Sequence, residues 1–405
     1  MRWMDKTLEW GARVPLKLRR LVLVTATSAL VALSAVAQAV SAPPAAPPLR
    51  VATFDSGFGG YLTAKSIEVT AASLLQHYDT AITIRHYGDT KNLPYGEKTP
   101  AQIATLGSAG VLRAFEQGAD MVFIACNTAS TQYDRIRQAV DAAYPGQVKP
   151  VVSIIDASAK EAKRLLDESL AQRSTATFLI MATPATVRAM VYPRQLARLY
   201  AAPLVEEAPR AFTQPRWYTA NGPTIDSLIQ KSAINLPGGR HIEVIQLAPA
   251  NWVELIEHGA DEKLKREAVR RDLGLLAKQL PKAAGPDVVG YFCTHYPIFD
   301  DTIRAEVALQ LPTPRPPTYI AQGQLMARIF QGMAEERLQG RQRKVPLAAE
   351  QLQALLGTAR ANITISGQNG PVTRQLAQTM FPNDPAPVVT EEDLGSLTPA
   401  APAPR

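Results

Sequence analysis

The sequence predicts an α/β fold of two pseudo-symmetric domains with mainly parallel sheets and an active site between them. Three observations lead to this fold class. Short β-branched runs alternate with amphipathic stretches from residue 49 onward, as in βαβ units. Continuous apolar runs such as Met121–Ala125 are typical of strands buried on both faces. Polar motifs follow several of these runs directly, where the strands of a parallel sheet present ligand-binding loops.

The predicted elements follow one another in regular order. Segments of four to eight residues rich in Val, Ile, Thr and aromatic residues are predicted as strands: Arg50–Phe54, Ile82–Tyr87, Met121–Ala125, Val151–Ile155, Thr177–Met181, Ile242–Gln246, Asp287–Phe292 and Thr318–Ile320. Stretches with helical periodicity lie between them: Pro100–Gln117, Thr131–Tyr144, Ala157–Gln172, Asp261–Leu280 and Gln322–Leu338.

Five polar motifs come directly after predicted strands. In open α/β sheets the ligand lies outside the carboxyl ends of the strands, so these motifs are expected to converge on one site. Two of them contain a cysteine, and each cysteine belongs to a different half of the chain, about 49–145 and 176–320. The motifs are Asp55–Gly57, Gly88–Thr90, Cys126–Thr128, Thr183–Thr186 and Cys293–Pro297.

The chain is expected to divide into five parts. A leader and a Pro/Ala linker precede two α/β domains, the second of which contains a long irregular insertion. A segment that returns to the core and a Pro/Ala-rich tail, expected to be disordered, complete the chain. The predicted bounds are 1–48 for leader and linker, 49–150 and 151–340 for the domains, 195–240 for the insertion, 341–382 for the returning segment and 383–405 for the tail.

The N-terminal residues have the pattern of an export signal. Residues 1–20 carry six basic and two acidic side chains, and the uncharged stretch Leu21–Val40 ends in small residues with an A-x-A cleavage pattern. The same stretch is about long enough to span a bilayer uncleaved. We therefore expect an exported protein, periplasmic or anchored to the inner membrane through residues 21–40. A buried helix of the domain is the third interpretation.

The positive charge of the chain does not indicate nucleic-acid binding. The chain has a formal net charge of +7, of which the leader contributes +4, so about +3 remains for a mature protein. The high pI is then largely a targeting feature. A second copy of the chain, in a homodimer, is the other macromolecular partner considered.

Cys126 and Cys293 are the only cysteines in the chain. In an exported protein, two cysteines first suggest one structural disulfide. The sequence around each of them favours a chemical role instead. Removing a proton from one face of a carbon and returning one to the other face requires two similar acid/base groups, and a pair of thiols on facing domains meets that requirement. A helix N-terminus after the strand would lower a thiol pKa toward neutrality.

Supporting groups lie beside both cysteines in the sequence. Asp55 and His295 could accept or share a thiol proton, and neutral donors suited to a carboxylate are Ser56, Asn127, Thr128 and Thr294. Each has a simpler alternative: Asp55, Ser56 and Asn127 as helix or turn caps, and His295 as a hydrogen-bonded core histidine. Only their co-occurrence favours a site.

These motifs resemble those of glutamate racemases, in the aspartate/glutamate racemase superfamily. The similarity covers roughly residues 50–380, with gaps. The combination of ACNTA and CTHYP at this separation is highly specific, and PYGEK is typical of the glutamate members. The matching segments are Phe54–Gly60, Tyr87–Thr90, Leu93–Lys98, Ile124–Ala129, Ala182–Val187 and Cys293–Pro297, with a weaker match at Ile365–Gln368.

The resemblance implies roles for individual residues. Cys126 would exchange the α-proton of the D-enantiomer and Cys293 that of the L-enantiomer, and the other catalytic residues implied are Asp55, His295 and Glu257. Family members need neither pyridoxal phosphate nor a metal, and the sequence shows no obvious site for either. The implied substrate-binding residues are Ser56, Asp89, Pro94, Tyr95, Gly96, Asn127, Thr128, Thr183, Thr186 and Thr294.

The expected function is therefore racemisation of glutamate by a two-cysteine acid/base mechanism, with a small acidic amino acid as substrate. Glutamate racemases serve peptidoglycan precursor synthesis in the cytoplasm, whereas the leader here indicates export. Two alternatives stay open: a racemase of aspartate or another amino acid, and a non-catalytic periplasmic binding protein on the same fold.

Overall fold

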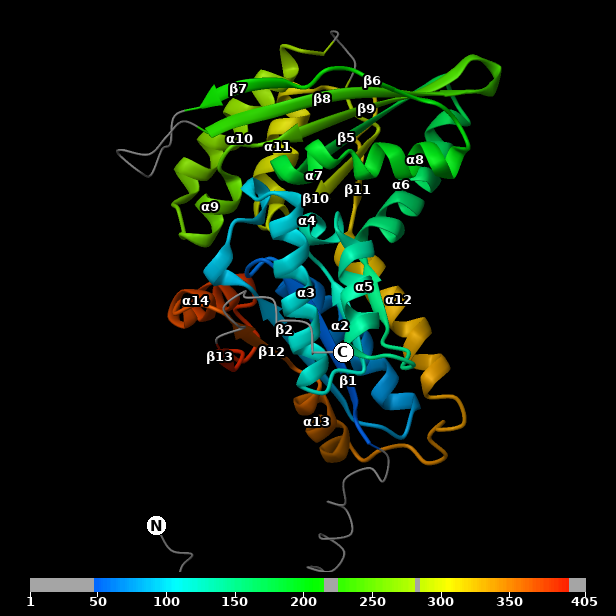
Figure 1. Cartoon of the computed structure of the whole chain (residues 1–405), viewed down its shortest axis with the longest axis vertical. Coiled ribbons are helices and arrows are strands. Elements are labelled where there is room, and N and C mark those ends of the chain that lie inside the picture. Colours follow the sequence, from blue (N-terminus) through cyan, green and yellow to red (C-terminus); the bar gives the residue numbers. More distant parts are fainter. Residues whose placement is uncertain (1–46, 215–224, 281–284, 393–405) are drawn as a thin grey trace, which may run out of the picture.

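The computed structural model describes residues 47–214, 225–280 and 285–392. They form two α/β domains, one above the other in Figure 1, so the predicted fold class is confirmed. The expected leader 1–48 lies outside these residues except for its last two. In the described ranges, no helix is both long and apolar enough to cross a bilayer.

The first domain is built on a six-stranded, entirely parallel sheet in the order β13-β12-β2-β1-β3-β4. Its strands are β1 Leu49–Asp55, β2 Ile82–Gly88, β3 Met121–Ile124, β4 Val151–Ser153, β12 Ala361–Ile365 and β13 Val389–Glu391. Its helices are α2 Tyr61–His77, α3 Pro100–Glu116, α4 Asn127–Ser130, α5 Tyr133–Ala143, α12 Gln322–Arg337, α13 Ala349–Thr358 and α14 Gly370–Met380.

The second domain contains a mixed sheet in the order β11-β10-β5-β9-β8-β6, with β7 also paired to β8. The strands from β11 to β9 are parallel, whereas β8 runs antiparallel to its neighbours. The strands are β5 Thr175–Ala182, β6 Leu204–Glu206, β7 Arg210–Gln214, β8 Ile225–Leu236, β9 Arg240–Ala248, β10 Val288–Phe292 and β11 Thr318–Ile320. The helices are α6 Ile154–Leu170, α7 Pro184–Ala189, α8 Val191–Tyr200, α9 Trp252–Glu257, α10 Glu262–Ala277 and α11 Asp300–Gln310.

Local sequence signals explain where several helices begin. α3 starts with Pro100 after Thr99, whose hydroxyl accepts from the backbone N–H of Gln102 in a capping box. The Asp261 side chain caps α10, and the Ser153 hydroxyl caps α6. The cap at Ser153 ends the predicted strand Val151–Ile155 two residues early, because Ile154 and Ile155 already belong to the helix.

The domain bounds differ from the expected ones at three places. β4 pairs with β3 of the first sheet, so 151–153 belong to the first domain and not to the second. Helix α12 packs against α2 and so also returns to the first domain. β13 pairs with β12, and residues up to 392 are therefore ordered, not part of a disordered tail from 383; residues 393–405 lie outside the described ranges.

The insertion 195–240 is not irregular. Its described residues complete α8 and then form β6, β7 and β8, which extend the second sheet as an antiparallel edge. Edge strands of this kind lengthen a sheet without altering the parallel strands beside the site. Residues 215–224 of the insertion lie outside the described ranges.

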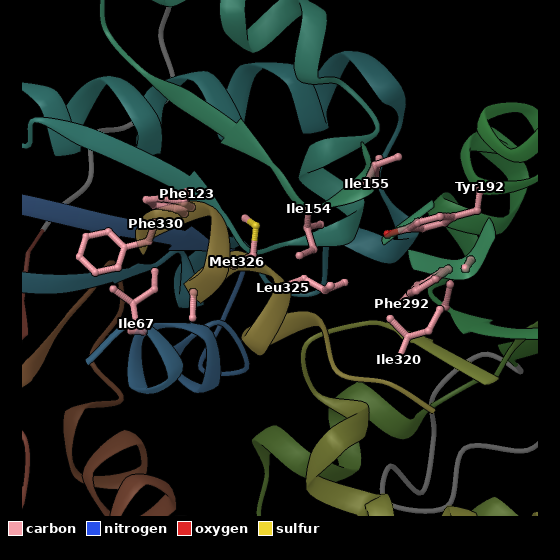
Figure 2. Close-up of a cluster of buried hydrophobic side chains, with 14 of the residues drawn as sticks. Ile67, Phe123, Ile154, Ile155, Tyr192, Phe292, Ile320, Leu325, Met326 and Phe330 are labelled. Atoms are coloured by element: carbon pink, nitrogen blue, oxygen red, sulfur yellow. The ribbon is translucent and has the colours of Figure 1, made fainter. Parts of the chain in front are cut away.

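One hydrophobic cluster continues from the first domain into the second. Phe123 and Phe330 belong to its first-domain part, and Tyr192 and Phe292 to its second-domain part. Figure 2 shows the side chains of Ile154 and Leu325 between these two groups. The two sheets are therefore joined through packed side chains and not only through the connecting chain.

Candidate active site

The carboxyl ends of strands from both sheets face one small cavity of about 40 Å³. One water needs roughly 10–15 Å³ on this scale, so the cavity has room for only a few waters. Among the residues that line it in the described part of the chain, none is Lys or Arg. The lining residues are Ser56, Pro94–Glu97, Cys126–Thr128, Thr183, Pro184, Pro249–Glu254 and Cys293–Tyr296.

Both cysteines border this cavity, one from each domain. Cys126 follows β3 of the first sheet and Cys293 follows β10 of the second. Both side chains are buried, at 4% relative exposure, and both are free thiols. A structural disulfide, the first interpretation of the cysteine count, is therefore absent between these two residues.

Cys126 occupies the position before α4, where its sulfur accepts a hydrogen bond from the Ala129 N–H at 3.4 Å. Its thiol donates to the Ser56 hydroxyl at 3.6 Å. Burial raises the pKa of Cys126 to about 12, and the nearby Asp55 carboxylate adds to the shift. The expectation that the helix N-terminus lowers this pKa is wrong, because desolvation outweighs the hydrogen bonds to the sulfur.

Asp55 lies behind Ser56 at the end of β1 and is completely buried. One carboxylate oxygen accepts from the Gly57 N–H at 3.0 Å, and the other accepts from the Thr294 hydroxyl at 3.0 Å. Burial raises the pKa of Asp55 to about 6, although the charge of His295 and these hydrogen bonds oppose the shift. Asp55 itself does not border the cavity.

A chain of polar contacts leads away from Cys293. Its sulfur lies 3.7 Å from His295 Nδ1, and His295 Nε2 lies 2.5 Å from Glu257 Oε1. The same Glu257 oxygen accepts from the Phe58 N–H at 2.9 Å. Burial disfavours the charged imidazole, but the hydrogen bonds to Cys293 and Glu257 outweigh burial and raise the pKa of His295 well above its usual value. A positive charge is then available beside the Cys293 sulfur.

Burial and the His295 contact have opposite effects on Glu257, and the pKa of its carboxyl is lowered on balance. This buried carboxylate and the imidazolium therefore form an ion pair. The glutamate that the resemblance implied is thus placed against His295, although it does not border the cavity.

Three threonines join the loops after β3 and β5. Thr128 Oγ1 lies 2.7 Å from Thr183 Oγ1 and 3.3 Å from Thr186 Oγ1. Thr128 and Thr183 border the cavity, whereas Thr186 lies behind them and does not. The Thr186 hydroxyl contacts the hydroxyls of Thr128 and Thr183, and its expected contact with the substrate stays a prediction.

The loop after β2 presents Pro94, Tyr95 and Gly96 to the cavity, as expected. Asp89 does not reach it, because its carboxylate accepts hydrogen bonds from the Tyr95 hydroxyl at 2.7 Å and from the Ser366 hydroxyl at 2.6 Å. Asp89 therefore supports Tyr95 from behind, and its expected contact with the substrate stays a prediction. The Asn127 amide is likewise engaged within the protein, although Asn127 borders the cavity.

The segment Pro249–Glu254 forms a wall of the cavity that the sequence reasoning missed. The Trp252 indole N–H donates to buried Asp272 at 2.8 Å, and the Ser227 hydroxyl donates to the same carboxylate at 3.0 Å. These bonds fix the wall from behind. The Ala248–Pro249 match that pointed to Glu257 was the available signal for this segment.

His86 is a second residue that the sequence reasoning missed. It is completely buried, its Nδ1 lies 2.9 Å from Thr53 Oγ1, and its Nε2 lies 3.0 Å from the Gly57 carbonyl oxygen. Since a carbonyl only accepts, Nε2 carries the hydrogen. Burial lowers the pKa of His86 to about 4, so this ring is a neutral support for the loop after β1. No group of three or more potential metal ligands occurs in the described ranges.

Comparison with known proteins shows which class of protein this chain resembles. Residues 61–215 match the family model for Asp/Glu/Hydantoin racemases. This stretch includes Cys126 and ends before Cys293. Over these residues the chain is similar to that class.

Within that class the chain is similar to glutamate racemases. It is 28% identical over 263 residues to glutamate racemase of Herpetosiphon aurantiacus, covering 64% of this chain and 76% of the relative. It is also 28% identical over 254 residues to that of Desulforudis audaxviator, covering 62% and 69%. These similarities make the chain a glutamate racemase-like isomerase.

Two solved structures share its fold. A glutamate racemase isoform of Bacillus anthracis superposes with a TM-score of 0.56 at 17% identity, covering 85% of this chain and 97% of that one. The glutamate racemase of Francisella tularensis, solved in complex with D-glutamate, gives a TM-score of 0.55 at 18% identity, with 86% and 98% covered.

Proposed function

We propose that this racemase-like chain interconverts L- and D-glutamate by proton transfer between the α-carbon and two cysteine thiols. The observation that carries the proposal is that Cys126 and Cys293 come from different domains, border the same cavity and are not bonded to each other. Neither aspartate racemisation nor non-catalytic binding is favoured by the similarities above.

The proposed reaction needs no net change in the protein. The thiolate of one cysteine takes the α-proton, so that the C–H bond breaks, an S–H bond forms and the electron pair stays on the substrate carbon and its carboxyl group. The thiol of the other cysteine then gives its proton to the opposite face of that carbon. After one turnover the two sulfurs have exchanged protonation states, and exchange of protons with solvent restores them before the next turnover in the same direction.

The surroundings of the two sulfurs differ, although their roles are equivalent. Asp55 and Ser56 stand beside Cys126, whereas His295 and Glu257 stand beside Cys293. The substrate itself supplies an ammonium group, and a positive charge close to the buried Cys126 sulfur would oppose the desolvation that raises its pKa. We therefore propose that binding of the substrate lowers the pKa of the Cys126 thiol and so makes the thiolate available as a base.

Recognition of the two substrate carboxylates is proposed to use neutral donors. The hydroxyls of Ser56, Thr128 and Thr183 belong to residues that border the cavity, and its described lining contains no lysine or arginine. Charge-assisted hydrogen bonds from such donors bind a carboxylate strongly without adding a group that titrates.

The proposal is tested by chiral analysis of the purified full chain with L- or D-glutamate, with and without reductant. We expect both enantiomers to reach the same one-to-one mixture. Parallel assays of α-deuterium exchange with glutamate and aspartate in D₂O separate the substrates. Exchange with aspartate alone would show that aspartate is the substrate. Absence of exchange with every acidic amino acid would support the non-catalytic binding protein instead.

Export is proposed from the sequence of residues 1–40, which lie outside the described ranges. Attachment to the membrane through residues 21–40 and homodimer formation likewise stay predictions. Fractionation of cells that produce the full chain or a form lacking residues 1–40 tests export. The proposal requires the full chain in the periplasmic or membrane fraction and the shortened form in the cytoplasm.

A further inference from the structure

Four polar side chains meet where the chain passes between the two domains, next to the cavity but mostly outside its lining. The chain leaves the first sheet through α6 and returns to the first domain between β11 and α12. Ser158 belongs to α6 and Gln322 is the first residue of α12. Asn127 is in α4 and Tyr192 is in α8. The cluster thus includes both connections between the domains.

These four side chains form a continuous hydrogen-bonded network. Asn127 and Gln322 pair amide to amide, with Asn127 Nδ2 donating at 2.8 Å and Gln322 Nε2 donating back at 3.0 Å. Gln322 Nε2 also lies 2.7 Å from the Ser158 hydroxyl and 3.2 Å from the Tyr192 hydroxyl. The Tyr192 hydroxyl donates to Asn127 Oδ1. A buried network whose members are all paired favours one arrangement of the elements that carry it.

Tyr192 also contacts the residue that precedes the second cysteine. Its ring stacks on Phe292 with 3.7 Å between the ring centroids and 23° between the planes. Figure 2 shows both rings in the cluster that joins the domains, beside Ile154 and Ile155. Because Phe292 precedes Cys293 and Asn127 follows Cys126, one side chain touches the neighbours of both sulfurs.

From this geometry we infer that Tyr192 is a positioning residue that sets the distance between the Cys126 and Cys293 sulfurs. The inference rests on the proposed racemisation. It adds to that proposal the residue that keeps the two cysteine sulfurs at a fixed distance from each other. Tyr192 suits this role because it is completely buried and its ring has few rotatable bonds. Burial also raises the pKa of its hydroxyl, which therefore stays a neutral donor.

The small cavity explains why such a device matters. A volume of about 40 Å³ is too small for glutamate as it stands, since it corresponds to only about three or four waters. Side chains that line the cavity must therefore shift when the substrate binds. The Tyr192 network would hold the elements that carry the two sulfurs in place during this shift.

Loss of the Tyr192 hydroxyl is expected to uncouple the two proton transfers. One sulfur could still remove the α-proton, exchange it with solvent and return it to the same face. The second sulfur, no longer held in place, would deliver a proton less often. Two quantities are measured: the deuterium found in recovered L-glutamate and the amount of D-glutamate formed. Their ratio, the exchange-to-inversion ratio, reports how well the second sulfur is positioned to deliver its proton. Partial unfolding lowers both quantities equally and leaves the ratio unchanged.

The experiment compares the full-length protein with Tyr192→Phe, Gln322→Leu and Tyr133→Phe, using L-glutamate in D₂O. Tyr192→Phe keeps the stacking on Phe292 and removes only the hydroxyl. Gln322→Leu breaks the network at a residue that does not border the active-site cavity. Tyr133→Phe is the matched control, because it removes a hydroxyl that donates to the Val151 carbonyl at 3.0 Å, away from both cysteines.

We expect Tyr192→Phe to lower kcat on the order of tenfold, as for a modest misplacement of reacting groups, and to raise the exchange-to-inversion ratio by a similar factor. Gln322→Leu should shift the ratio in the same direction, and Tyr133→Phe should leave it at the wild-type value. A wild-type ratio in Tyr192→Phe would overturn the inference. Failure of the wild-type protein to racemise glutamate would instead overturn the proposed function.

Discussion

The Thr294 hydroxyl donates a 3.0 Å hydrogen bond to the buried carboxylate of Asp55. Asp55 ends the first strand of one domain, and Thr294 follows Cys293 at the end of β10 in the other. The group proposed to assist Cys126 is thus bonded to the residue after the opposite cysteine. A change in the protonation of Asp55 therefore affects the surroundings of Cys126 and, through Thr294, those of Cys293.

The fall of kcat/KM at low pH should follow the protonation of Asp55. Burial raises the pKa of Asp55 to about 6, and its proposed helper role requires the carboxylate, so kcat/KM should fall as the pH drops through about 6. Asp55→Asn should lose about a hundredfold or more in kcat/KM, the range of a positioned acid or base, and should lose this fall at low pH. An unchanged fall in the variant would assign the titration to another group.

Glu257→Gln tests the ion pair behind Cys293. The amide can still accept from the Phe58 N–H, but the charge that raises the pKa of His295 is removed. We expect a drop of at least about tenfold in kcat/KM and a loss of activity that begins at lower pH than in the wild type, because His295 deprotonates earlier. The drop must be equal for both enantiomers, since their equilibrium constant is one. A wild-type pH profile would contradict the role.

His86 should govern part of the stability at acid pH. Burial lowers its pKa from 6.5 to about 4, so its contribution is fully present above pH 6.5 and is lost as the pH falls through about 4. Asp55 acts in the opposite sense, because its raised pKa stabilises the fold below about pH 4, and this contribution disappears as the pH rises through about 6.

The contributions of His86 and Asp55 to the free energy of unfolding are separated by denaturant unfolding of the wild type and His86→Gln at pH 7 and pH 4. Asp55 is present in both proteins, so its contribution cancels in the comparison. Between these pH values the wild type should lose roughly 3 kcal/mol more than the variant. Equal losses would show that His86 does not titrate in this range.

A matched pair of glycine substitutions tests the packing under the first sheet. A Cβ on Gly110 of α3 would lie 2.0 Å from the Phe54 ring, whereas a Cβ on Gly332 of α12 meets no atom within 4 Å. Gly110→Ala should therefore destabilise the fold by about 1–3 kcal/mol. Gly332→Ala should stabilise it by about 0.5–1 kcal/mol through helix propensity. Thermal unfolding measures both, and a neutral Gly110→Ala would show that α3 shifts freely against β1.

Much of the site could be predicted because its residues follow strands whose apolar pattern is unambiguous. Met121–Ile124 and Val288–Phe292 are buried along their whole length, and parallel strands end at the same edge of a sheet. This rule places Cys126 and Cys293 at the ligand-binding edges of their own sheets, and the similarity of the two halves of the sequence predicted that these edges face one site. The helix α2 was missed, because its N-terminus at Gly60 has no side-chain cap to mark it.

Other features depend on distant contacts that local patterns do not contain. Nothing in Val151–Ser153 tells which sheet it joins, and Tyr192 and Gln322 are 130 residues apart yet share a hydrogen bond. The pKa of Cys126 was misjudged for the same reason. Its local sequence shows a helix N-terminus, whereas the dominant effect is burial of the sulfur.

The most direct test of the central claim replaces each cysteine by alanine in the full chain and measures glutamate racemisation. If both sulfurs carry protons, Cys126→Ala and Cys293→Ala should each lose about a hundredfold or more in kcat, while circular dichroism shows the wild-type fold. Racemisation at the wild-type rate in either variant would contradict the two-cysteine mechanism.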